Sequence, residues 1–254
     1  MTSQVSTLLA RLTTERATGA LLRDTGTLYL ADGAVVHAES PAAPGLDALL
    51  TRGGRLPTEG WREAVDRAGA RRRVARYLVE KGHMSSGELE ICHLGALFDA
   101  AFFVLAPDSG PARFRSGAAH WLGPVRPVPV PAVEREARRR RELLDRLWPR
   151  PEVDTAPVVA VPAAGGPATT CRQRAVLAAA DGVRTATGIA WLLGRPAFHT
   201  LLDVRRLAAA GRVRTPPAAA PPPAPTLPAW VAGISADPDV ALLHRLRDAL
   251  EARL

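Results

Sequence analysis

Apolar positions in the first forty residues change from the spacing of a helix to that of β-strands. In residues 4–12 they recur at helical intervals, which predicts a short amphipathic helix. After Gly19 the pattern changes to short apolar runs separated by turn residues. These runs predict three strands, over residues 20–22, 27–31 and 34–38. Asp32-Gly33 between the last two fits a tight hairpin, because both residues tolerate the positive φ of a type I′ turn.

The densest helical pattern in the chain runs from about Glu88 to Leu105. Ser85 and Glu88 fit a capping box at its start, since the serine side chain can accept from the helix and the glutamate can reach back. This pattern predicts a long buried helix. Shorter helical patterns precede it, at residues 45–50 and 71–79. A second hairpin is expected after it, with strands at 112–115 and 119–122.

Several motifs in the first fifty residues resemble the PATAN-type bacterial domain, a domain of unknown function. They are Thr18-Gly19-Ala20-Leu21, Leu28-Tyr29-Leu30, Asp32-Gly33, Val35-Val36-His37-Ala38 and Gly45-Leu46-Asp47-Ala48-Leu49. The resemblance covers about residues 1–123 and departs from the pattern at Pro41–Pro44 and Gly53–Gly60, where extra helix breakers occur. It implies an interaction module, often fused to signalling or regulatory parts. A protein partner is therefore expected for residues 1–123.

Residues 124–167 have the composition of a linker that contains one charged helix. Pro127, Pro129 and Pro131 predict an extended connector, because each proline lacks a backbone donor and disfavours helix in the residue before it. Acids and arginines alternate over residues 132–147, which predicts a solvated helix. From Pro149 to Pro167 no periodic pattern is present, which is typical of a linker.

Residues 168–215 are expected to form three short helices joined by turns. Thr185 suits an N-cap, Gly194 suits the turn before the third helix, and Pro196 suits that helix's first turn. The order of these signals resembles the winged helix-turn-helix of bacterial regulators. The resemblance implies that the third helix faces the DNA major groove and that Arg212-Val213-Arg214 begins the wing.

Positive charge is concentrated in this same segment. The net charge of the chain is +8, and residues 168–214 contain eight arginines and two aspartates. Because Lys81 is the single lysine, the clustering of arginines is more informative than their number. Arginines suit phosphates and a helix face suits bases. The candidate DNA-binding residues are Arg195, His199, Thr200, Arg206, Arg212 and Arg214.

The same features leave room for an alternative. Asp203 is expected on the face of the third helix that would read bases, and the alanines nearby offer little hydrogen bonding. Winged helices also bind proteins or form dimers.

Beyond this segment, residues 216–236 have the composition of a Pro/Ala linker. Residues 237–254 predict a terminal amphipathic helix that either docks on its own chain or pairs with a second copy, so a homodimer is possible.

The sequence contains no recognisable catalytic or cofactor motif. It has no HExxH, GxSxG, P-loop or GxGxxG pattern, and its six histidines do not occur at ligand spacing. Cys92 and Cys171 lie far apart, which favours a reducing compartment. No secretory signal or long apolar run is present. We therefore expect no catalytic residue, cofactor, metal or membrane contact, and a cytoplasmic location.

Together these patterns predict an α+β protein in which a mixed helix and antiparallel hairpin domain (1–123) precedes a linker with a charged helix (124–167). A winged helix-turn-helix (168–215), a Pro/Ala linker (216–236) and an amphipathic helix (237–254) follow. The favoured function is a DNA-binding transcriptional regulator with an N-terminal sensing or protein-interaction domain. The alternative is a signalling adaptor that does not bind DNA and uses both domains for protein contacts. An enzyme is not expected.

Overall fold

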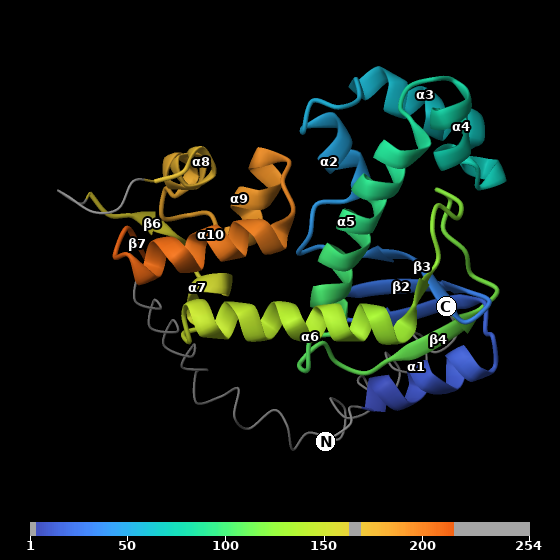
Figure 1. Ribbon diagram of the computed structural model, residues 1–254, viewed down its shortest axis with the longest axis horizontal. Coiled ribbons are helices and arrows are strands. Elements are labelled where there is room, and N and C mark those ends of the chain that lie inside the picture. The colour runs from blue at the N-terminus through green and yellow to red at the C-terminus, as the bar shows by residue number, and fades with distance from the viewer. Residues whose placement is uncertain (1–3, 163–168, 216–254) are drawn as a thin grey trace, which may run out of the picture. The chain divides into compact units, whose positions relative to one another are not determined.

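A computed structural model describes residues 4–162 and 169–215, which belong to one compact unit (Figure 1). Its fold is mixed α+β with antiparallel sheets, as the sequence predicts. The linker and helix expected over 216–236 and 237–254 lie outside the described residues. Among those described, no helix is both long enough and apolar enough to cross a membrane.

The larger sheet has five strands in the order β4-β1-β2-β3-β5, and all neighbours are antiparallel. The strands are β1 (Gly19–Arg23), β2 (Gly26–Ala31), β3 (Ala34–Glu39), β4 (Arg113–Ser116) and β5 (Val128–Pro129). Asp32 and Gly33 join β2 to β3 with φ values of 53° and 77°. The predicted hairpin is therefore confirmed, with both loop residues at positive φ as a type I′ turn requires.

The prediction of a second hairpin, with strands at 112–115 and 119–122, is wrong. β4 forms, but it pairs with β1, so that Gly19 lies opposite Ser116. Residues 119–122 form no strand, and the chain continues to the other edge of the sheet, where β5 pairs with β3. Adding a strand to each exposed edge satisfies more backbone groups than an isolated two-stranded hairpin would.

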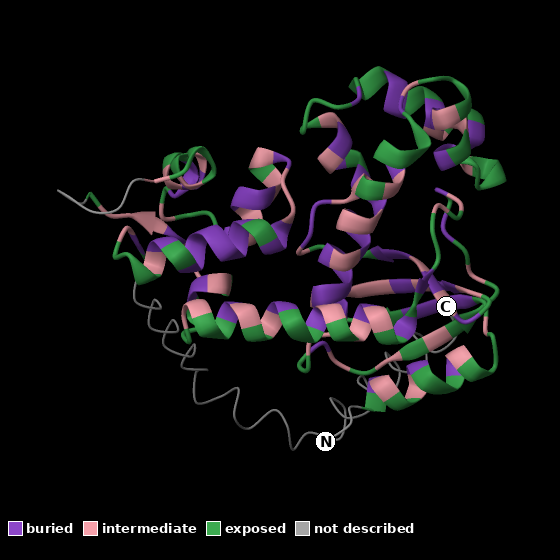
Figure 2. Cartoon of the chain, in the orientation of Figure 1, coloured by how far each residue is buried: buried purple, intermediate pink, exposed green. Residues whose placement is uncertain are grey.

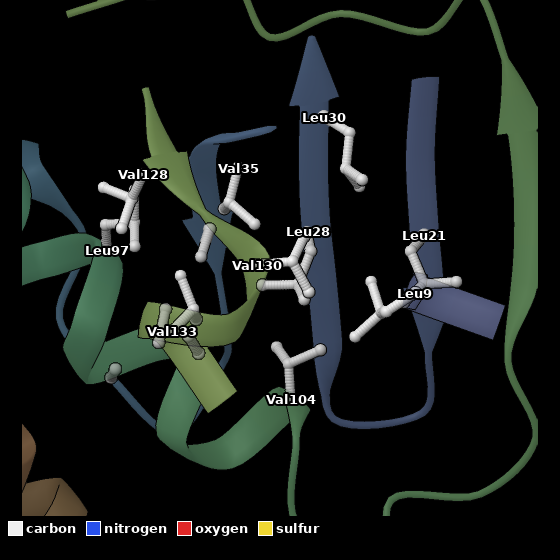
Figure 3. Close-up of a cluster of buried hydrophobic side chains, with 14 of the residues drawn as sticks. Leu9, Leu21, Leu28, Leu30, Val35, Leu97, Val104, Val128, Val130 and Val133 are labelled. Atoms are coloured by element: carbon white, nitrogen blue, oxygen red, sulfur yellow. The ribbon is translucent and has the colours of Figure 1, made fainter. Parts of the chain in front are cut away.

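Three helices supply most of the helical side chains in the apolar cluster on the larger sheet. They are α1 (Gln4–Thr14), α5 (Ser86–Val104) and α6 (Val130–Leu147). In Figure 3, Leu9 of α1 lies beside Leu21 of β1, and Val104 of α5 and Val130 of α6 lie near Leu28. At the start of α5, Ser85 and Glu88 form the predicted capping box. The charged helix begins at Val130 rather than 132, with Pro131 in its first turn.

A second cluster of buried side chains packs short helices against α5. These helices are α2 (Leu46–Thr51), α3 (Thr58–Ala68) and α4 (Val74–Glu80), with the single turn η1 (Gly69–Arg71) between the last two. Leu50, Trp61 and Leu78 belong to this cluster together with Leu89 of α5. The long helix α5 is therefore buried against both the sheet and the short helices, which explains why its apolar pattern is so dense.

The remaining elements lie in the C-terminal part of the described chain. They are α7 (Glu152–Thr155), β6 (Val159–Ala160), α8 (Cys171–Ala179), α9 (Ala186–Leu193), α10 (Ala197–Ala209) and β7 (Val213–Arg214). Thr185 caps α9, and Gly194 ends it in a left-handed conformation, as expected. Residues 149–162 do not form the structureless linker that we expected. They contain α7 and β6, and β6 pairs with β7.

Candidate functional site: a basic groove beside α10

Helix α10 is enclosed on most of its surface. Nine of its thirteen residues are buried, and Figure 2 shows it largely in the colour of buried residues. Its side chains share an apolar cluster with α8 and α9 and also with Phe102 of α5 and Leu144 of α6. The boundaries expected at residues 123 and 168 therefore fall inside a continuously packed unit.

A buried carboxylate fixes the start of α10. Asp99 of α5 is fully buried, and its two oxygens accept from the backbone N–H groups of Ala197 (2.5 Å) and Phe198 (2.8 Å). Pro196 at the N-cap offers no side-chain acceptor, so Asp99 satisfies amides that would otherwise lack partners. Arg140 of α6 lies 3.5 Å from the same carboxylate. Burial raises the pKa of Asp99, and these donors oppose that shift.

The candidate DNA-binding residues do not share one open face. Thr200 is 2% exposed, and its hydroxyl donates to the carbonyl of Pro196. The expectation that Thr200 lies on an open helix face is therefore wrong. His199, Arg206 and Arg214 are exposed, whereas Arg195 and Arg212 are half-buried. Asp203, which we expected on the same open face, is also buried.

A groove of about 590 Å³ lies beside the first turn of α10. One wall comes from the end of α2 and from α5, and the other comes from α8, the end of α9 and α10. Four arginines line this basic groove, and Asp203 is the single carboxylate among its lining residues. The four arginines are Arg52, Arg55, Arg172 and Arg195, and the lining also includes Ile91 and His199.

The arginines of the basic groove differ in how they are held. Arg52 donates to the carbonyl of Trp191 at 2.9 Å, and Arg55 lies 3.0 Å from the sulfur of Cys92. Arg195 has a buried Nη1 without a hydrogen-bond partner among the described residues. A buried guanidinium nitrogen without a partner is costly. The guanidinium groups available to an anionic group in the groove are those of the exposed residues Arg52, Arg55 and Arg172.

Close backbone contact brings the two walls together. Gly194 has φ 58°, and a Cβ added to it would lie 2.5 Å from the Cβ of Arg52. Glycine is thus required twice at this position, once for the left-handed conformation and once for the approach of α2. The sequence signal for the turn was visible, but the neighbour that makes it indispensable comes from residues far earlier in the chain.

Comparison of the chain with protein-family models, with curated proteins and with solved structures finds no match.

Proposed function

We propose that this protein is a signalling adaptor that binds an acidic segment of a partner protein in the basic groove. The observation that carries the proposal is the enclosure of α10 together with the open groove beside it. In this proposal residues 1–123 form the PATAN-like part. Residues 168–215 form a winged helix that binds protein. Both parts contribute walls to one binding site.

The chemistry of the groove supports an acidic occupant with apolar side chains. Four arginines against one aspartate favour carboxylates, which guanidinium groups bind in bidentate geometry. Burial raises the pKa of Asp203, and the nearby arginines Arg206, Arg172 and Arg195 oppose that shift. Ile91 is 71% exposed at the groove. An acidic segment that also presents an apolar side chain would cover it.

DNA binding is the second candidate, and exposed arginines favour it. Arg172, Arg174 and Arg214 are exposed and suit contacts with phosphates. Base readout by α10 is disfavoured, because Thr200 and Asp203 are buried. Any DNA binding in this arrangement should therefore be weak, sensitive to salt and largely independent of sequence.

A binding assay with the full chain tests the proposal. The probes are a fluorescent peptide rich in Asp, Glu and Leu, the same peptide with Gln in place of its acids, and a 20-base-pair duplex. We expect the acidic peptide to bind and the peptide with Gln in place of its acids not to bind. The double substitution Arg55→Ala and Arg172→Ala should weaken it by at least about tenfold, since each charged contact is worth roughly 1 kcal/mol or more.

The matched control removes two exposed arginines outside the groove, Arg62→Ala with Arg138→Ala. This control loses the same net charge and should bind the acidic peptide like the unchanged protein. Equal weakening by both pairs, or no binding of the acidic peptide, would overturn the proposal. Tight binding of one duplex sequence over others would instead support the second candidate.

A further inference from the structure

Three of the six histidines gather at one place beside the larger sheet. His37 comes from β3, His93 from α5, and His120 from the segment between β4 and β5. Their exposed fractions are 5%, 0% and 8%. A chain that buries three imidazoles in contact must satisfy their polar atoms, so the arrangement needs a chemical explanation.

Contacts within the cluster are specific. His37 Nδ1 lies 3.2 Å from His93 Nε2, and the rings of His37 and His120 stack with centroids 4.0 Å apart. Glu39 Oε1 lies 2.9 Å from His120 Nε2, and the Tyr29 hydroxyl donates to Glu39 Oε2 at 3.0 Å. Two imidazoles and a carboxylate therefore meet, each held by a further neighbour.

The spacing of these groups fits a small coordination site. One ligand atom each from His37, Glu39 and His120 can be chosen so that all lie within 4.8 Å of one another. His37 and Glu39 are two residues apart on β3, which places them on the same face of the strand. Tetrahedral zinc with bonds of about 2.0 Å needs ligand atoms roughly 3.3 Å apart. Binding would require the three side chains to move closer together and the stacked rings of His37 and His120 to turn, so that a nitrogen of each points at one ion.

His93 lies where it can orient His37 as a metal ligand. Because His37 Nδ1 contacts His93, Nε2 is the nitrogen left to bind an ion. Ligating histidines commonly donate their second ring N–H to a partner that fixes the ring.

His120 and Glu39 provide the entry side. The backbone N–H of Leu122 donates to His120 Nδ1 at 3.3 Å, so the neutral ring carries its proton on Nε2, facing Glu39. For Nε2 to bind an ion, the ring proton has to move to Nδ1, and the 3.3 Å hydrogen bond from the Leu122 N–H is then lost. The Glu39 side chain is 47% exposed, which gives an ion access from solvent.

We propose that His37, Glu39 and His120 bind one divalent transition-metal ion of the zinc class, with His93 positioning His37. Two imidazoles and one carboxylate are ligands that zinc favours, and the fourth position is left to water or to a partner's side chain. The ion would tie β3 to the segment that follows β4. This inference is independent of the basic groove.

Metal titration of the full chain tests this inference. After removal of metals with a chelator, the protein is titrated with Zn²⁺ in competition with a chromophoric chelator. We expect one ion bound per chain. Glu39→Gln and His120→Asn should each weaken binding by at least about tenfold, a loss that changes around metal sites commonly cause. Cobalt in place of zinc should give visible absorption bands that Glu39→Gln reduces.

His83→Asn serves as the control, because His83 lies outside the cluster and its loss should leave binding unchanged. Circular dichroism checks that each variant is folded. If His120→Asn fails to fold, the exposed Glu39 still carries the test. Absence of stoichiometric binding, or equal affinities for Glu39→Gln and His83→Asn, would overturn the inference.

Discussion

The sheet formed by β1 to β3 and the helix α10 are both well buried, but they are held in different ways. The strands pair with neighbours a few residues away, through tight turns such as Asp32-Gly33. Helix α10 is held by Asp99, 98 residues before Ala197, and by the contacts of Arg205 with residues about fifty positions earlier. Local pattern therefore determines the first region, and long-range polar contacts determine the second.

Asp99→Ala should have the largest effect on this second region. It leaves two backbone N–H groups of α10 without their acceptor and removes one of the two carboxylates that face the guanidinium of Arg140. We expect a loss of about 3–5 kcal/mol in the free energy of unfolding, as for other broken buried pairs. Urea unfolding measures it, with the exposed Asp66→Ala as control. A loss close to that of the control would show that Asp99 does not anchor α10.

Arg205→Ala should be the next most damaging. Arg205 is 2% exposed, donates twice to Asp154 and donates to the carbonyl of Trp148. Its removal should cost about 2–4 kcal/mol, because the partly exposed Asp154 regains some water. Arg205→Lys should recover only part of this loss, since an ammonium cannot donate in bidentate geometry. Full recovery by lysine in urea unfolding would contradict the account.

A pair of glycine substitutions isolates the contact between α2 and the end of α9. Gly194 and Gly211 have φ of 58° and 66°, so alanine at either costs about 1–2 kcal/mol for the left-handed conformation. A Cβ at Gly194 also meets Arg52, whereas one at Gly211 meets nothing within 4 Å. Thermal unfolding should therefore show Gly194→Ala to be about 1 kcal/mol worse than Gly211→Ala. Equal losses would mean that the contact contributes no strain.

The smallest expected effect on stability concerns Glu136 on α6. Its carboxylate accepts hydrogen bonds from Arg139 and Arg140. The bond to Arg139 is the largest cause that lowers its pKa, to about 2 from 4.5. Because the folded pKa is depressed, the stabilisation is complete above about pH 4.5 and is lost as pH falls towards 2. Solvent screening limits it to about 1 kcal/mol.

Urea unfolding between pH 6 and pH 2.5 measures this contribution. Glu136→Gln should remove that part of the pH dependence, while the exposed Glu59→Gln should leave it intact. An unchanged pH dependence in Glu136→Gln would assign the effect to another carboxylate.

What the sequence could predict follows the same division. The capping box at Ser85 and the turn at Asp32-Gly33 were predictable, because every group involved lies within a few residues. The pairing of β4 with β1 was not, since either free sheet edge could accept a strand. Asp99 was visible as an acid within an apolar helix, yet nothing in the sequence names its partners.

The candidate sites depend on the same long-range contacts. His37, His93 and His120 share no spacing that a ligand motif would show, because they come from a strand, a helix and an irregular segment. The basic groove likewise joins Arg52 and Arg55 to Arg172 and Arg195, which only the packing of α10 brings together. In both cases the sequence contained the residue types but not their association.

Thr200 is buried in the folded chain, and we therefore predict that it is not available to contact DNA bases. Thiol labelling tests it, using Thr200→Cys and the exposed Ala209→Cys in a background with Cys92→Ser and Cys171→Ser. We predict that a cysteine at position 209 labels at the rate of the unfolded protein and that a cysteine at position 200 labels far more slowly until urea unfolds the chain. Equal, rapid labelling of both positions in the folded protein would contradict it.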